Sequence, residues 1–227
     1  MNSWEGKFGD EYIDRNPMDA YDLDKLYEKR YGITRTEMNE RFIGSMYRWI
    51  RILEVGCGAG AQLDCLKKMG FNNVSGADIS KKAHEISLCD LHNDFYLANA
   101  EDMSCFPDGI FKLVFTSGLL IHIPPDKLGQ VMSEIHRVSS KYIWGFEYHS
   151  DSTTPIMIPY RGMDNMLWKA NYPMLYWLAF KDLVLVDFQR YPQKDNPNNV
   201  DVMFLLKKVE VGDWEKEGRV RDETGNS

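Results

Sequence analysis

The sequence LEVGCGAG at residues 53–60 decides the fold of this chain. An apolar run that includes Glu54 is followed by three glycines at alternate positions. This pattern is typical of a buried strand that turns sharply into a helix beneath a bound nucleotide. Gly56 and Gly58 let the backbone bend and approach a ligand closely, and the free N–H groups of the next helix point at that ligand. The stretch therefore predicts a cofactor-binding turn.

Strands and helices alternate after this turn. Buried strands are expected at residues 51–56, 73–79, 94–99, 111–117 and 141–148, and helices at 61–69, 80–91 and 125–138. Strands joined by helices of this length imply right-handed crossovers and a parallel sheet that binds ligands at the carboxyl ends of its strands. The sequence therefore predicts a Rossmann-like, doubly wound α/β fold, with the site above Gly56, Asp78, Ala100 and Ser117.

Segments before and after this alternation complete the predicted fold. A capping-box pattern ahead of apolar residues at helical spacing predicts a core-facing helix over residues 34–49, and an earlier helix is expected between residues 18 and 29. Residues 183–191 and 200–209 are apolar or alternating on either side of a polar turn. They predict an antiparallel hairpin at the end of the mostly parallel sheet.

The domain organisation follows from these segments. One α/β domain is expected over residues 1–209, with a helical N-terminal lid in residues 1–50 and a charged tail in residues 210–227. Residues 149–175 interrupt the alternation of strands and helices and are rich in aromatic side chains. A long segment with few helix signals at the edge of a site is usually functional or disordered, and the aromatic residues argue against disorder. We interpret this segment as a substrate-recognition insert.

The composition limits the classes of partner. A length of 227 residues with 44% hydrophobic content suits one domain with a full core. The 27 basic and 34 acidic residues give a net charge of −7, and no run of Lys or Arg stands out. Because a phosphate backbone attracts the opposite charge, no nucleic-acid partner is expected, and small-molecule substrates remain open.

The cysteines and the hydropathy pattern indicate a soluble, cytoplasmic protein without a bound metal. Neither CxxC spacing nor the histidine spacing of a zinc site is present, so reduced thiols are expected at Cys57, Cys65, Cys89 and Cys105. The first residues lack a signal-peptide pattern, and no apolar stretch approaches the ~20 residues needed to span a bilayer.

Two cofactors fit the glycine turn. Asp78, after the second strand, can accept both ribose hydroxyls of NAD or of S-adenosylmethionine. The methyl donor is favoured because Glu54 can accept N–H bonds from the loop and because the turn follows a helical segment instead of opening the fold. Residues 99–102 and 106–115 add two later motifs. Together these motifs resemble those of class I S-adenosylmethionine-dependent methyltransferases, and a nicotinamide-dependent sugar oxidoreductase is the alternative.

Four stretches resemble a narrower family. They are FGDEYIDRN at residues 8–16, LEVGC at 53–57, GLLIHI at 118–123 and PYRG at 159–162. They resemble the pseudaminic acid biosynthesis-associated methylases, small class I enzymes associated with bacterial nonulosonic-acid sugar clusters. The resemblance extends from about Trp4 to Leu206, and residues 149–158 depart from the family pattern. It implies metal-independent methyl transfer from S-adenosylmethionine to an oxygen or nitrogen of a small, sugar-derived acceptor.

The methyltransferase interpretation assigns roles to residues at the strand ends. The methionine end of the cofactor is expected beside the glycine turn, the sulfonium beside the fourth strand, and the ribose and adenine beside the second and third strands. The contacts expected at the methionine end are Glu54, Gly56, Cys57 and Gly58, and Ser117 is expected at the sulfonium. Asp78 is expected at the ribose, and Ile79, Ala100 and Glu101 are expected at the adenine.

The N-terminal residues 1–17 are polar but carry several aromatic side chains, Trp4 and Tyr12 among them. One interpretation is a lid that closes over the cofactor and excludes water, with Tyr12 and Arg15 contacting the cofactor and Arg15 near its carboxylate. The alternative is that the segment packs against the outside of the sheet.

His122 is the candidate catalytic base, because no other side chain in the loop at residues 116–125 titrates near neutral pH. The alternative is a packed histidine between two isoleucines. Tyr148, Tyr160 and Arg161 are expected to contact the acceptor together with His122. Arg161 either anchors an acidic acceptor or holds the insert to the sheet through backbone carbonyls. A binding protein that has lost turnover is the remaining alternative for the whole chain.

Overall fold

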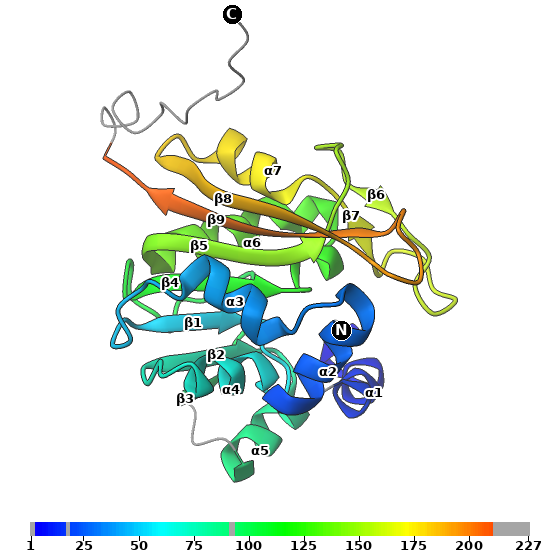
Figure 1. Ribbon diagram of the computed structural model, residues 1–227, viewed down its shortest axis with the longest axis horizontal. Helices are drawn as coiled ribbons and strands as arrows, with labels where there is room; N and C mark the ends of the chain where they lie inside the picture. The colour runs from blue at the N-terminus through cyan, green and yellow to red at the C-terminus, as the bar shows by residue number, and fades with distance from the viewer. Residues whose placement is uncertain (1–2, 17–18, 91–93, 211–227) are drawn as a thin grey trace, which may run out of the picture.

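The computed structural model describes residues 3–16, 19–90 and 94–210; the side chain of Cys89 and the tail at residues 211–227 lie outside the described part. Its centre is a seven-stranded sheet in the order β3-β2-β1-β4-β5-β9-β8 (Figure 1). Strands β1 to β5 are parallel, whereas β9 is antiparallel to β5 and β8 is antiparallel to β9. The predicted mostly parallel sheet with an antiparallel C-terminal hairpin is confirmed. The strands of this sheet are β1 Ile52–Val55, β2 Val74–Asp78, β3 Asp94–Leu97, β4 Phe111–Ser117, β5 Ser139–Tyr148, β8 Leu183–Pro192 and β9 Val200–Lys208.

Helices cover both faces of this sheet (Figure 1). Helices α2, α3 and α4 pack on one face, and α6 and α7 pack on the other. Side chains alternate between the two layers along each strand, so on β4 Leu113 and Phe115 join the first layer and Val114 joins the second. None of the described helices has both the length and the apolar character that crossing a membrane requires. The helical elements are η1 Ser3–Glu5, α1 Lys7–Arg15, α2 Ala20–Tyr31, α3 Arg35–Ile43, α4 Ala61–Lys68, α5 Lys81–Asp90, η2 Leu120–His122, α6 Pro125–Val138 and α7 Tyr172–Ala179.

Helix α3 is shorter than predicted. The capping box is present, because the Glu37 N–H donates to Thr34 Oγ1 (3.1 Å) and the Thr34 N–H donates to Glu37 Oε2 (2.8 Å). The helix ends at Ile43, however, and Gly44 is its C-cap. Trp49, predicted to face the core, is 69% exposed. Its predicted position is wrong because the chain leaves the helix before reaching it.

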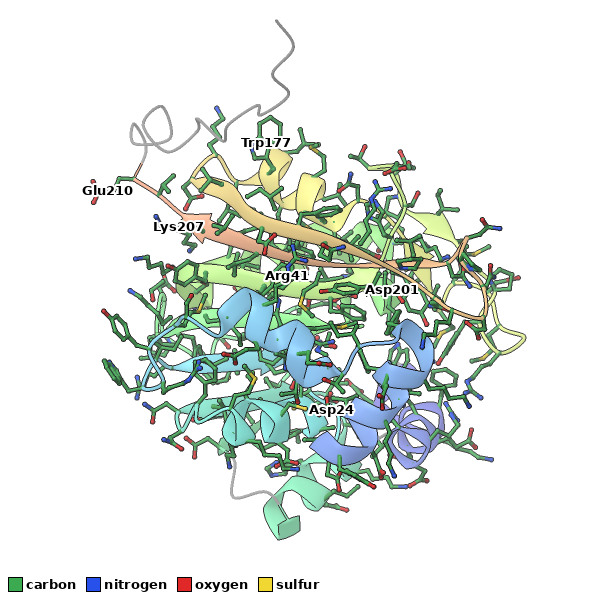
Figure 2. All side chains as sticks on the ribbon, viewed as in Figure 1. Asp24, Arg41, Trp177, Asp201, Lys207 and Glu210 are labelled. Carbon is green, nitrogen blue, oxygen red and sulfur yellow. The ribbon has the colours of Figure 1, made fainter. Side chains whose placement is uncertain are left out.

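Polar contacts hold α2 and α3 to each other and to the sheet. Asp24 on α2 accepts the backbone N–H and the hydroxyl of Thr36 at the start of α3, both at 2.8 Å. Tyr31, at the end of α2, donates its hydroxyl to Asp201 on β9. Figure 2 labels Asp24 and Asp201, which mark the two ends of this attachment. The two helices are thereby fixed beside the carboxyl ends of β1 and β4.

The segment at residues 149–175 has regular structure of its own. It contains a small antiparallel sheet of β6 Ile156–Met157 and β7 Trp168–Lys169, and α7 begins within it. Tyr172 and Tyr176 on α7 are 0% and 1% exposed and belong to the core cluster. The aromatic character of Tyr172, the one of these two within residues 149–175, therefore reflects core packing, and the role of the segment in substrate recognition stays a prediction.

Candidate active site

The predicted sharp turn is present at residues 56–60. Gly56 and Gly58 adopt φ angles of +74° and +52°, in the left-handed region that side chains disfavour. A Cβ atom on Gly56 would lie 2.7 Å from the Leu119 side chain. The N–H groups of Gly56 and Cys57 donate to the carbonyl of Ala77 (2.7 and 3.2 Å), which ties the turn to β2. A side chain at Gly56 would therefore both strain the backbone and clash with Leu119.

Two cavities meet above this turn. The first cavity, of about 470 Å³, lies beside the ends of β1 and β2 and the chain that follows β3. The second cavity, of about 340 Å³, extends from the same turn to α2 and the end of β5. A ligand in one is adjacent to a ligand in the other because the cavities share lining residues. These shared residues are Tyr12, Ile13, Gly56, Gly58, Gly118 and His122.

Asp78 lies in the first cavity, as the sequence predicts for a ribose-binding carboxylate. Its Oδ2 accepts the Gly58 N–H and its Oδ1 accepts the Ser80 N–H, both at 2.8 Å. Burial raises the pKa of this carboxyl above its usual value, against these hydrogen bonds, which lower it. Each carboxylate oxygen keeps a further lone pair for a ligand hydroxyl. The residues predicted at the adenine also line this cavity: Ile79, Ala100 and Glu101.

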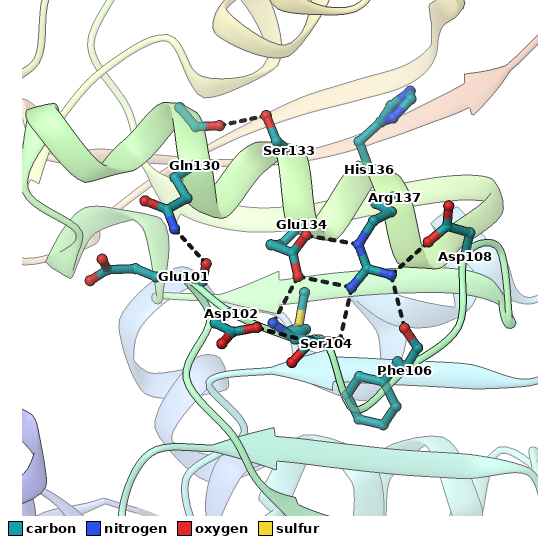
Figure 3. A network of polar contacts seen from close by, with 12 residues as sticks. Glu101, Asp102, Ser104, Phe106, Asp108, Gln130, Ser133, Glu134, His136 and Arg137 are labelled. Carbon is teal, nitrogen blue, oxygen red and sulfur yellow. Dashed lines mark hydrogen bonds and ion pairs between the residues drawn. The ribbon is translucent and has the colours of Figure 1, made fainter.

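Helix α6 fixes the loop that forms one wall of the first cavity (Figure 3). Arg137 donates to the carbonyls of Met103 (2.9 Å) and Phe106 (2.8 Å). Gln130 donates to the carbonyl of Glu101 (2.8 Å). These bonds span about thirty residues of sequence, and the residues that make them carried no motif. The wall is therefore held by contacts that only the folded chain assembles.

Two buried oxygen atoms beside the turn have no hydrogen-bond partner among the described residues. They are Oε2 of Glu54 and Oε1 of Gln62, and both residues line the second cavity. Burial raises the pKa of the Glu54 carboxyl well above its usual range. The expectation that Glu54 accepts N–H bonds from the loop is wrong, because Asp78 accepts the Gly58 N–H instead. Cys57 also lines the second cavity, and burial raises the pKa of its thiol.

The N-terminal segment lies over the cavities. Trp4 lines the first cavity and packs on His122 with 4.6 Å between ring centroids, and Tyr12 lines both cavities. The alternative that the segment packs against the outside of the sheet is therefore wrong. Arg15 lines neither cavity and pairs with Glu11 at 3.8 Å on the same helix. The structure thus contradicts the predicted place of Arg15 near the cofactor.

His122 lies in the shared wall of the two cavities, with a defined tautomer. Its Nδ1 lies 2.7 Å from the carbonyl oxygen of Met166, and a carbonyl only accepts, so Nδ1 carries the hydrogen. Nε2 therefore bears the lone pair. Burial lowers the pKa of His122 to about 4, so the ring is neutral at physiological pH. The side chain is therefore packed, with a neutral ring whose Nε2 can accept a proton, and its role as catalytic base stays a prediction.

Glu147 accepts hydrogen bonds from the backbone of the loop that carries His122. It is fully buried on β5, and its two oxygens accept the N–H groups of Leu119 (3.3 Å) and Ile121 (3.4 Å). Burial raises the pKa of this carboxyl to about 7. Sequence reasoning missed this residue, although a lone carboxylate within an otherwise apolar strand was an available signal.

The second cavity carries the predicted acceptor-binding residues. Tyr148, Tyr160 and Arg161 line it together with His122. Arg30 on α2 lines it as well, and the sequence offered no signal for this residue beyond its place in a helix. Neither Arg30 nor Arg161 forms an ion pair with a carboxylate of the described residues. The cavity wall thus holds two arginines without an ion pair to a described carboxylate, although burial raises the pKa of the Asp201 carboxyl and the Arg30 charge acts to lower it.

Arg161 lies in a strained two-residue turn. Tyr160 and Met163 exchange backbone hydrogen bonds (2.9 and 3.0 Å) around it, and Arg161 and Gly162 adopt φ angles of +52° and +75°. Arginine rarely adopts this conformation, and such strain is concentrated at functional sites. The Arg161 guanidinium makes no hydrogen bond within the described chain and lies 5.8 Å from the Tyr160 ring. The interpretation that it holds the insert through backbone carbonyls is therefore wrong.

Comparisons with known proteins agree with this geometry. A family described as "Methyltransferase domain" matches residues 53–141. No curated protein matches the chain. A solved structure from Pyrococcus horikoshii OT3 is 18% identical with a TM-score of 0.64 and covers 88% of this chain and 99% of its own. An S-adenosylmethionine-dependent methyltransferase from Anabaena variabilis is 14% identical with a TM-score of 0.65, covering 92% and 94%.

A third solved structure contains ligands. It is the 1,6-didemethyltoxoflavin-N1-methyltransferase of Burkholderia thailandensis with bound 1,6-didemethyltoxoflavin and S-adenosylhomocysteine; it is 16% identical with a TM-score of 0.61 and covers 77% of this chain and 76% of its own. At these identities the solved structures show a shared fold, and the family match adds the domain. The fold and the turn define a class I methyltransferase architecture. The chain is a methyltransferase, and S-adenosylmethionine is its cofactor.

Proposed function

We propose that this methyltransferase transfers the methyl group of S-adenosylmethionine to an oxygen or nitrogen of a small, acidic, sugar-derived acceptor in the second cavity. The observation that carries the proposal is that Arg30 and Arg161 both lie in the wall of that cavity and that the Arg161 guanidinium has no ion pair with the described residues. In a chain with a net charge of −7, an anion needs such local cations to bind. The phenol groups of Tyr148 and Tyr160 match sugar hydroxyls, and the resemblance to the pseudaminic acid-associated methylases favours a sugar acid.

The first cavity fits the adenosine part of the cofactor. Asp78 would accept the ribose hydroxyls with the lone pairs that Gly58 and Ser80 leave unused. The adenine would lie among residues 79 and 98–101, in the wall that α6 fixes. This placement directs the reactive end of the cofactor toward the glycine turn and the wall shared with the second cavity. His122 in that wall then lies between donor and acceptor.

The bound cofactor supplies a methyl group that its sulfonium makes electrophilic, and the transfer leaves S-adenosylhomocysteine. The chain aligns the acceptor, excludes water and takes up a proton. His122 accepts the proton from the acceptor hydroxyl or ammonium through Nε2, because Met166 holds the ring with Nδ1–H turned away. Arg161 and Tyr160 orient the acceptor, Tyr12 covers both cavities, and Trp4 covers the first cavity beside His122.

A substrate panel tests this proposal. The protein is incubated with S-adenosylmethionine and sugar acids, nonulosonic acids among them, together with the matched neutral sugars. S-adenosylhomocysteine release and methylated products are then measured by mass spectrometry. Turnover with the acids but not with the neutral sugars is expected. Methylation of neutral or basic acceptors in preference to acids would overturn the proposed acceptor class.

A fold of this kind also occurs in a protein named for another activity, a cyclase. The cyclase SpnF is 13% identical with a TM-score of 0.61 and covers 76% of this chain and 79% of its own. For this reason the panel includes binding as well as turnover. If S-adenosylhomocysteine raises the melting temperature and NADH does not, the donor assignment stands. Binding of the cofactor without product from any acceptor would favour the non-catalytic alternative.

A further inference from the structure

Arg35, at the start of α3, is a buried cation in direct contact with no carboxylate of the described residues. Its side chain is 0% exposed, and it makes no ion pair with the described residues. Its Nε donates to Asn39 (2.8 Å), and its Nη2 has no hydrogen-bond partner among those residues. An isolated buried charge is strongly unfavourable unless hydrogen bonds or an anion compensate it. The rings of Tyr27, Trp144 and Phe146 lie 4.8–5.5 Å from the guanidinium and compensate part of this cost, and a nearby anionic ligand group would compensate more of it.

Arg35 orients two hydroxyl groups that line the second cavity. Its Nη1 donates to the hydroxyl oxygens of Tyr27 (2.9 Å) and Ser117 (3.2 Å). An arginine only donates, so both oxygens act as acceptors and keep their own hydrogens. If one hydroxyl donates to the other, the second hydrogen is still free to donate into the cavity. The guanidinium charge behind the hydroxyls also makes them stronger donors toward an anion.

Acceptor atoms of the opposite kind lie beside these donors. The unpartnered oxygens of Glu54 and Gln62 line the same cavity, and Gln62 Nε2 lies 3.5 Å from the Ser117 hydroxyl. The Arg35 charge also acts on the Glu54 carboxyl, which places the two groups within electrostatic reach. Donors that favour a carboxylate and acceptors that favour an ammonium thus lie side by side. This pattern is complementary to an α-amino acid zwitterion.

We propose that the hydroxyls of Tyr27 and Ser117, backed by Arg35, bind the α-carboxylate of the methyl donor, while Glu54 and Gln62 accept its ammonium group. The inference rests on S-adenosylmethionine as donor and assigns three residues, Tyr27, Arg35 and Gln62, that the sequence had not indicated. It gives Arg35 the part that sequence reasoning gave to Arg15. Arg35 acts as a positioning residue through the two hydroxyls.

Calorimetry with two ligands tests the inference. S-adenosylhomocysteine carries the amino acid group, whereas 5′-methylthioadenosine lacks it and shares the adenosine part. Tyr27→Phe and Ser117→Ala should each weaken S-adenosylhomocysteine binding about 10-fold or more, since each removes a hydrogen bond to a charged group. Their affinity for 5′-methylthioadenosine should stay within about 2-fold of wild type. Arg15→Ala, the matched control, should leave both affinities unchanged.

The outcomes separate this inference from the proposed function. If both variants bind S-adenosylhomocysteine as wild type does, or if they lose both ligands equally, the carboxylate site is wrong while the donor assignment stands. If Arg15→Ala selectively weakens S-adenosylhomocysteine, the carboxylate lies at Arg15. If the wild type binds neither ligand, the proposed donor itself fails. Arg35→Lys is a further variant that keeps the charge and loses the bond to one hydroxyl. If Arg35→Lys does not fold, Tyr27→Phe and Ser117→Ala alone decide whether the carboxylate binds there.

Discussion

Replacing Arg161 with glycine should impair the binding of an acidic acceptor without destabilising the protein. Arg161 adopts a φ angle of +52°, and a left-handed conformation costs a residue with a side chain about 1–2 kcal/mol. Glycine removes this strain, and its greater freedom in the unfolded chain offsets about 0.5–1 kcal/mol of the gain. The guanidinium makes no hydrogen bond within the described chain, so little is lost. The free energy of unfolding should therefore stay the same or rise by up to about 1 kcal/mol.

The effect on the acceptor should be large and selective. Losing a paired, charge-assisted contact worth about 1.5–3 kcal/mol raises the Michaelis constant for an acidic acceptor roughly 10- to 150-fold. A neutral acceptor should be unaffected. Arg161→Ala is the matched variant, because it keeps the strained backbone and removes the same guanidinium. It should show the same kinetic defect as Arg161→Gly with a lower melting temperature, by about 2–4 °C per kcal/mol of strain.

The assays are thermal unfolding and steady-state kinetics on a sugar acid and its neutral counterpart. The proposed role of Arg161 is refuted if both variants unfold several degrees below wild type and slow acidic and neutral acceptors equally. That result would make Arg161 a structural residue despite its lack of bonds. An unchanged Michaelis constant in folded variants would also refute it, since the acceptor would then not touch Arg161.

Three more predictions concern the loop of His122 and the N-terminal segment. His122→Ala should lower turnover roughly 10²- to 10⁴-fold with S-adenosylhomocysteine affinity little changed, and near-full turnover in a folded variant would leave His122 as a packing residue. The pKa of Glu147 rises from 4.5 to about 7 on folding, so the folded state keeps a proton that the unfolded state releases, and stability falls as pH rises through this window. Glu147→Gln lacks this titration, so the difference in unfolding free energy between the variant and the wild type should shift by about 3 kcal/mol in favour of the variant from pH 4.5 to 7, as measured by urea titration. A difference that does not change with pH would contradict the effect of burial on Glu147. Hydrogen exchange across residues 4–16 should slow when S-adenosylhomocysteine binds, and equal exchange would show that Trp4 and Tyr12 cover the cavity without closing on the ligand.

The sequence determined the elements of this protein and the place of its site, because those signals are local. The three glycines predicted a sharp turn from strand to helix, since glycine adopts the left-handed angles that such a turn needs. Alternating strands and helices predicted the parallel sheet, and a parallel sheet binds ligands at the carboxyl ends of its strands. Asp78 and His122 could be placed at the site for that reason alone. Their positions depend on where strands end, which a short stretch of sequence encodes.

Only the tertiary structure decided which side chains meet at the site. The tautomer of His122 depends on the carbonyl of Met166, 44 residues away, and the chain between them gives no local sign of it. Arg15 and Arg35 look alike in the sequence, yet packing leaves Arg15 outside the cavities and buries Arg35 against Ser117, 82 residues away. Periodicity tells which face of a helix is apolar, but not which polar side chain the neighbouring elements enclose. That choice is made when the helices dock on the sheet, because burial and hydrogen bonding are then settled together.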